Sequence, residues 1–186
     1  MPVPYTLDIT QRNWVLGLDP AIADVEDDAL LGTGPVIRVR WKGVPAAVKL
    51  FSEPSIFDNE RHALQVLCRS RFVPELFAFG TADTSFSNGR AASPFRHWIC
   101  RAWVEDNRRK RLPLPEPARF ARQLSAFCDE CTKAGLSMGD GKLENFRWCG
   151  QRLTWLDYGW FYPGTPASVA GHNRAFCSRL LAVLGW

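Results

Sequence analysis

The sequence has few of the residues that build metal centres. It contains three histidines, two methionines and six scattered cysteines in 186 residues, and the histidines show no metal-ligand spacing. Cys128 and Cys131 are the one close cysteine pair, and they lie in a helical pattern with no second ligand pair nearby. This favours helix packing over structural zinc or redox chemistry. Cysteines inside apolar runs are typical of buried thiols and favour a reduced, cytoplasmic setting.

Long apolar runs are also missing. No stretch has the length needed to span a membrane, and the first residues lack the basic and apolar regions of a secretory signal peptide. We therefore expect a cytoplasmic protein with no membrane partner. The net charge of +4 is mild. It suits a small anionic ligand and does not require nucleic acid, so we expect no nucleic-acid partner.

The apolar patterning predicts one domain of mixed α+β structure. Segments with the pattern of strands are 36–41, 46–51, 76–80, 97–103, and a hairpin of 146–148 with 153–156. Segments with the pattern of helices are 55–69, 118–134 and 168–184. We expect a lead-in with one short helix over residues 1–28. We expect a loop over 81–94, because this stretch is rich in Ser, Gly and Asn.

Four polar residues in the second half follow one another in an order that suits phosphoryl transfer. Asp140, Lys142 and Asn145 lie close together, and Asp157 comes after the predicted hairpin. Transfer from ATP needs a carboxylate to orient the acceptor hydroxyl, a cation near the moving phosphoryl group and hard oxygens for Mg²⁺. Any one of these residues alone would be interpreted as a turn residue or a cap. Their joint order favours the catalytic interpretation.

A glycine-containing loop precedes the first predicted hairpin. It runs from Leu31 to Val39 and includes Gly32, Thr33 and Gly34. Taken alone, this loop fits a structural β-turn better than a loop that covers phosphates.

The next strand carries Ala47 and Lys49 among apolar residues. A lysine in this setting either snorkels from an edge strand or has its charge satisfied by a partner. The favoured partner is Glu60, which lies within the predicted helix. Glu53 is the competitor, but it precedes Pro54 and falls outside that helix.

Together these motifs resemble those of the protein kinases, whose glycine loop, strand lysine, helix glutamate, Asp/Lys/Asn loop and Asp-x-Gly turn follow in this order. The resemblance extends from Leu31 to Gly159. It implies a bilobal α+β fold within a single domain, residues 1–186. The N-terminal lobe and hinge, about residues 1–104, would hold an antiparallel sheet and a helix. About residues 105–186 would form a strongly reduced helical lobe.

The resemblance also implies a role for each candidate. The catalytic set is Asp140, Lys142, Lys49 and Glu60. The metal ligands are Asn145 and Asp157. The strand that enters the hinge lines the adenine pocket in kinases, which implies that Trp98, Ile99, Cys100 and Ala102 lie near the adenine. The implied ATP-binding set is Gly32, Thr33, Gly34, Val39, Ala47, Lys49, Cys100, Ala102, Asn145 and Asp157. The implied cofactors are ATP and Mg²⁺.

The chain departs from the kinase pattern in three places. Met138-Gly139 stands where kinases have His-Arg before the catalytic aspartate. Pro35 removes a backbone donor from the glycine loop, and Ile37 replaces its third glycine. After Gly159 no Ala-Pro-Glu motif is visible, so the helical lobe that docks peptide substrates would be mostly missing.

The predicted function is phosphoryl transfer to Ser or Thr of a protein, because Lys142 resembles the Ser/Thr-kinase pattern. We expect a monomer. The reduced form is similar to compact bacterial type III effector kinases that modify a host heat-shock chaperone, which implies virulence and delivery by a route independent of a signal peptide. Two alternatives stay open. Gly139-Asp140 is similar to small-molecule kinases, and Pro35 with Ile37 fits a nucleotide-binding pseudokinase.

Overall fold

The computed structural model describes residues 3–31, 35–86, 94–105, 116–142, 145–149 and 151–183. The chain separates into two compact units. The first comprises Met1–Phe57 and Glu75–Trp103, and the second comprises Asp58–Pro74 and Val104–Trp186. The predicted lobes of about 1–104 and 105–186 differ from these units in the segment Asp58–Pro74, which groups with the second unit.

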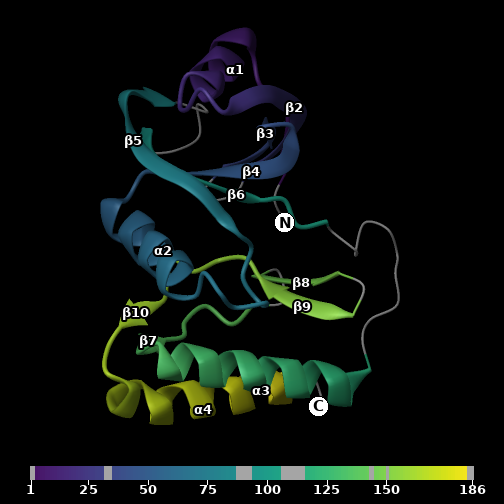
Figure 1. Ribbon diagram of the computed structural model, residues 1–186, viewed down its shortest axis with the longest axis vertical. Coiled ribbons are helices and arrows are strands. Elements are labelled where there is room, and N and C mark those ends of the chain that lie inside the picture. The colour runs from purple at the N-terminus through teal and green to yellow at the C-terminus, as the bar shows by residue number, and fades with distance from the viewer. Residues whose placement is uncertain are drawn as a thin grey trace. The chain divides into compact units, whose positions relative to one another are not determined.

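A six-stranded antiparallel sheet forms the body of the first unit (Figure 1). Its strands are β1 (Val3–Tyr5), β2 (Ile22–Leu31), β3 (Val36–Trp41), β4 (Val44–Phe51), β5 (Leu76–Phe86) and β6 (Phe95–Ala102). They lie in the order β1-β2-β3-β4-β6-β5. The turn between β3 and β4 is made by Lys42 and Gly43, with φ values of 47° and 81°. A two-residue hairpin turn of this type needs such a left-handed pair.

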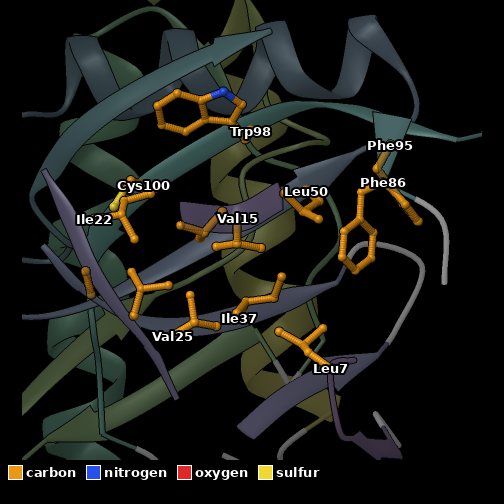
Figure 2. Close-up of a cluster of buried hydrophobic side chains, with 13 residues drawn as sticks. Leu7, Val15, Ile22, Val25, Ile37, Leu50, Phe86, Phe95, Trp98 and Cys100 are labelled. Carbon is orange, nitrogen blue, oxygen red and sulfur yellow. The ribbon is translucent and has the colours of Figure 1, made fainter. Parts of the chain in front are cut away.

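One face of the sheet shares an apolar core with helix α1 (Ile9–Leu16). Figure 2 shows Leu50 of β4 and Cys100 of β6 in this core with Val15 of α1. The helix begins at Asp8, whose side chain accepts from the Gln11 backbone amide at 2.8 Å while the Gln11 side chain accepts from the Asp8 amide at 3.0 Å. This reciprocal capping stabilises the first turn and so fixes the helix over the core.

The second unit contains two long helices and two small two-stranded sheets. Helices α3 (Pro117–Lys133) and α4 (Pro166–Val183) pack against each other and run in opposite directions (Figure 1). Strand β7 (Leu136–Ser137) pairs with β10 (Tyr162–Pro163), and β8 (Phe146–Cys149) pairs with β9 (Arg152–Trp155). The core of this unit is strongly aromatic and includes Phe127, Phe146, Trp155, Tyr158, Phe161 and Phe176.

Helix α2 (Pro54–Val66) begins in the first unit and continues into the second. Its first turn places Phe57 against Phe51 of β4, with ring centroids 5.8 Å apart, and stacks it on His97 of β6 at 5.0 Å. These contacts lie on the face of the sheet opposite to the core of α1, because Phe51 and Leu50 are consecutive in the strand.

Helix α3 ends at Lys133, and Ala134 and Gly135 follow it. This glycine has φ of +68°, and its carbonyl oxygen accepts from the Gly164 amide at 2.7 Å. An added Cβ would lie only 2.4 Å from the Gly164 oxygen, so both the conformation and the close approach require glycine here.

Most predicted elements are confirmed, and three are corrected. The helices predicted over 55–69, 118–134 and 168–184 and the hairpin over 146–156 correspond to α2, α3, α4 and β8–β9. The lead-in contains a long strand, β2, which was not expected. Strand β5 continues to Phe86, so the predicted loop was wrong over 81–86. The short pair β7–β10 was not predicted. Among the described residues, no helix combines the length and apolarity needed to cross a membrane.

Candidate active site

Asp140 lies on the irregular segment that follows β7, in a conformation that few residues adopt. Its φ is +50°, in the left-handed region, where Asp and Asn are tolerated better than most side chains. Such a residue costs about 1–3 kcal/mol and persists only where its surroundings impose it. The preceding Gly139 is tightly packed, because an added Cβ there would lie 2.3 Å from the Trp160 backbone oxygen.

The Asp140 side chain is partly buried, with 19% of it exposed, and it contacts Lys142. The Lys142 Nζ lies 2.7 Å from Asp140 Oδ1, and the lysine side chain is 66% exposed. The Lys142 backbone amide also donates to the Asp140 carbonyl oxygen at 2.8 Å. The structure therefore brings together the predicted carboxylate and cation, with the cation on the solvent side.

Asn145 joins this carboxylate to the hairpin. Its Nδ2 donates to the Asp140 carbonyl oxygen at 2.7 Å and to Asp140 Oδ2 at 3.2 Å. Its backbone oxygen accepts from the amide of Leu156 at 2.8 Å, and Leu156 immediately precedes Asp157. Asn145 is 8% exposed. A single buried residue is thus bonded both to Asp140 and to the neighbour of Asp157.

Asp157 begins a tight turn whose ends are both held. Its Oδ1 accepts from the Gly159 amide at 3.3 Å, and its backbone oxygen accepts from Trp155 Nε1 at 2.5 Å. The Gly159 oxygen accepts from Nδ2 of Asn59 in α2 at 3.1 Å. The fully buried Tyr158 anchors the middle of the turn by donating its hydroxyl to the Trp155 oxygen at 2.8 Å.

The donor set fits a magnesium ion that enters with a nucleotide. In the part of the chain that the structure describes, no three His, Cys, Asp or Glu side chains cluster as a metal cage would. Magnesium in kinase sites does not need a cage, because one or two protein ligands and the substrate phosphates suffice. The Asn145 amide nitrogen is committed to Asp140, so its amide oxygen is the atom that can serve the metal, together with the Asp157 carboxylate.

Lys49 lies on β4 in the first unit and is only 7% exposed. It pairs with Val36 of β3 and Ile99 of β6, and its Nζ lies 5.1 Å from the centroid of the Phe51 ring. Directly paired residues share a face of a sheet, so Val36 and Ile99 flank the ammonium group. Ile99 was among the residues expected near the adenine and Val36 was not, although strand alternation places both beside Lys49 once the register is known.

The predicted nucleotide-binding residues of the sheet divide between its two faces. Ala47 is two residues from Lys49 on the same strand and therefore shares its face. Val39 and Cys100 belong to the apolar core with α1 on the opposite face. Ala102 pairs with Ala46, another residue of that core, so it also lies opposite to Lys49. Ala47 therefore lies on the same face of the sheet as Lys49, whereas Val39, Cys100 and Ala102 lie on the opposite face.

Glu60 is fully buried in α2, one turn after Phe57. Its pairing with Lys49 stays a prediction. Gly32, Thr33 and Gly34 lie outside the described residues, so their predicted contact with phosphates also stays a prediction.

Comparison with known proteins identifies the architecture. No protein-family model and no curated protein matches the sequence. The Rio2 kinase of Chaetomium thermophilum, solved as an ADP/Mg²⁺-phosphoaspartate complex, matches 90% of this chain with a TM-score of 0.59 and 15% identity. The PK-1 kinase of Cydia pomonella granulovirus matches 76% with a TM-score of 0.54 and 18% identity. The chain has a protein kinase-like fold.

The chain spans 59% of the length of the Rio2 chain and 52% of the length of the PK-1 chain. The predicted fold class, an antiparallel sheet with a helix followed by a small helical part, is confirmed. At these identities the similarity concerns architecture alone. The resemblance to bacterial effector kinases is not shown by these neighbours.

Proposed function

We propose that the chain is an ATP- and Mg²⁺-dependent phosphotransferase that acts on Ser or Thr of a protein substrate. The observation that carries the proposal is the bonding of Asn145, which contacts Asp140 through its side chain and the neighbour of Asp157 through its backbone. On a kinase-like fold, this arrangement is the one that phosphoryl transfer requires: a base, an amide ligand and an acidic ligand linked in one rigid group.

Each residue of the loop has a defined task in this proposal. Asp140 accepts the proton of the attacking hydroxyl, and the bonds from Asn145 orient its carboxylate for that purpose. Lys142 is largely exposed, so its ammonium group can turn from Asp140 toward the charge that develops on the transferred phosphoryl group. When bound, Mg²⁺ supplies charge neutralisation between the phosphates. Asn145 and Asp157 would hold it.

Lys49 is the proposed anchor of the α- and β-phosphates. A lysine that is 7% exposed loses most of its hydration, and binding an anion offsets that cost. Glu60 is the proposed carboxylate partner, since a fully buried glutamate needs a cation or several donors to remain charged. Val36 and Ile99, which flank Lys49, would contact the nucleotide together with Ala47.

The test is transfer of label from γ-labelled ATP in the presence of Mg²⁺ and a host-cell lysate. Asp157→Ala and Lys49→Ala are expected to abolish transfer and to leave the fold intact. Asp129→Ala and Lys133→Ala are matched controls on exposed positions of α3 and should retain activity. Near-normal turnover of either site variant would contradict the assignment.

The same assay separates the competing functions. Label in a discrete protein band supports a protein kinase, and phosphoamino-acid analysis then identifies Ser or Thr. Label confined to small molecules supports a small-molecule kinase. Nucleotide binding without any transfer supports a pseudokinase.

We infer that a heat-shock chaperone is the first protein substrate to test, with the chain acting as a monomeric effector in the cytoplasm of a host cell. The support is the similarity of its motifs and reduced form to compact effector kinases. Incubation with a purified chaperone and labelled ATP tests this inference. Absence of label on the chaperone, with label on another lysate protein, would reject the substrate and retain the kinase.

A further inference from the structure

Helix α4 holds the main chain just before Asp140. Asn173 Oδ1 accepts from the backbone amide of Met138 at 2.9 Å, and His172 Nε2 donates to the Met138 carbonyl oxygen at 2.8 Å. His172 and Asn173 thus satisfy both the carbonyl and the amide of Met138, which lies two positions before the proposed base, Asp140. A carbonyl oxygen can only accept, so Nε2 of His172 is the donor of this bond.

Asn173 is itself held rigidly. It is fully buried, and its Nδ2 donates to the Leu136 carbonyl oxygen at 2.8 Å and to Thr132 Oγ1 at 3.0 Å. One amide therefore ties the end of α3, strand β7 and the start of the Asp140 loop to α4. A buried amide with all these partners is costly to displace, so Met138 has little freedom to move.

This restraint is transmitted to Asp140 over a very short segment. The Met138 side chain is buried, and Gly139 is pressed against the Trp160 backbone so closely that no Cβ fits. Asp140 then adopts its left-handed φ of +50°. With Asn145 holding the carboxylate from the other side, the orientation of Asp140 depends on where Met138 is fixed.

His172 contributes little to the core. Its side chain lies on an exposed part of α4 and stacks loosely on Phe176, with ring centroids 6.4 Å apart at 25°. The hydrogen bond of its Nε2 joins it to Met138, which precedes the Asp140 loop.

We propose that His172 and Asn173 are positioning residues that set the geometry of Asp140 through the main chain of Met138. The proposal rests on the proposed function for its catalytic consequence. Neither residue touches substrate in this proposal; both act by fixing the loop, and displacement of a catalytic group by about 1 Å can cost roughly 100-fold in rate.

The decisive variant is His172→Phe, which keeps a ring to stack on Phe176 and removes the donor to Met138. His172→Gln is the rescue variant, because its amide nitrogen can replace Nε2–H. Arg174→Ala, on an exposed neighbouring position of α4, is the control. Two quantities are measured: kcat and KM for Mg·ATP hydrolysis with water as acceptor, and hydrogen exchange of a peptide covering residues 136–142.

His172→Phe is expected to raise exchange in residues 136–142 and to lower kcat roughly tenfold or more, with KM for ATP within about twofold. His172→Gln should restore both quantities, and Arg174→Ala should change neither. Unchanged exchange in His172→Phe would overturn the proposal. So would a kcat of His172→Phe equal to that of an active wild type, or a failure of His172→Gln to restore either quantity.

A wild type that transfers no label in the lysate assay would refute the proposed function separately, and hydrogen exchange alone would then decide whether α4 fixes the loop. Asn173→Asp adds a second check. It keeps an acceptor for the Met138 amide and loses donation to Leu136, so it should protect the loop better than Asn173→Ala. Equal exchange in the two would contradict the role assigned to the Asn173 oxygen.

Discussion

Substitution of Asp140 separates its chemistry from its backbone conformation. Asp140→Asn keeps a side chain that suits the left-handed region and an oxygen that accepts from Asn145, so the bond to Oδ2 at 3.2 Å can persist. It loses the ion pair with the exposed Lys142, which is worth about 0–1 kcal/mol. We therefore expect the free energy of unfolding to fall by no more than about 1 kcal/mol.

Asp140→Ala is the matched contrast. Alanine at a φ of +50° lacks local support for that conformation, which costs about 1–2 kcal/mol. The lost bond from Asn145 adds about 1 kcal/mol. The expected destabilisation of about 2–3 kcal/mol corresponds to a fall in Tm of roughly 4–12 °C for a chain of this size.

Both variants remove the proposed base, so both should lower phosphoryl transfer by about 10²–10⁴-fold. Thermal unfolding followed by circular dichroism and transfer from labelled ATP measure the two effects. Equal Tm values for Asp140→Asn and Asp140→Ala would refute the conformational argument. Turnover of Asp140→Asn near the wild-type rate would refute the catalytic one.

Two further predictions concern packing and thiol reactivity. Gly135→Ala should destabilise the protein by about 2 kcal/mol or more, because Cβ would meet the Gly164 oxygen at a φ of +68°. Gly171→Ala, in α4 with open space around it, should stabilise by about 0.5–1 kcal/mol; chemical unfolding of both variants checks the opposite signs. Burial raises the pKa of the Cys100 thiol to about 12, with the charge of Asp19 as a second cause. Since the thiolate is the reactive form, iodoacetamide at pH 8 should label the exposed Cys68 and leave Cys100 intact until the protein unfolds, which peptide mass spectrometry detects.

The sequence allowed the Asp140 loop and the hairpin to be predicted because their chemistry is local. Asp140 and Asn145 are close in sequence, and the apolar alternation of β8 and β9 brings Asp157 back within a few residues. In the structure, Asn145 is bonded to Asp140 and to Leu156, the residue before Asp157. Short-range spacing was sufficient here because a two-stranded hairpin has little freedom in register.

The surroundings of Lys49 could not be predicted in the same way. Cys100 was selected for its closeness to the expected hinge, and the register of β4 with β6 pairs it with Val48, on the other face from Lys49. A shift of one residue in that register would exchange the two faces. A single sequence contains the alternation of each strand and not the pairing between them, so it could not show which residues of β6 share the face of Lys49.

Strand β2 was missed because its alternation is interrupted. Its pairing with β3 shifts between Ile22 and Asp24 and again between Val25 and Ala29. Each bulge moves side chains out of the two-residue period on which strand prediction depends. The end of β5 was missed for a related reason, since the register shifts between Thr81 and Phe86 and the intervening polar residues favour a loop.

Met138-Gly139 stands where the resemblance to kinases implies His-Arg, and the main chain of this loop is held in another way. The Met138 side chain is buried. An apolar side chain cannot restrain the backbone by hydrogen bonding, and the structure shows that restraint coming from His172 and Asn173. Polar residues within a helix are normally assigned to its solvent face. Their contact with Met138 exists only after α4 packs against β7, so no local pattern could have revealed it.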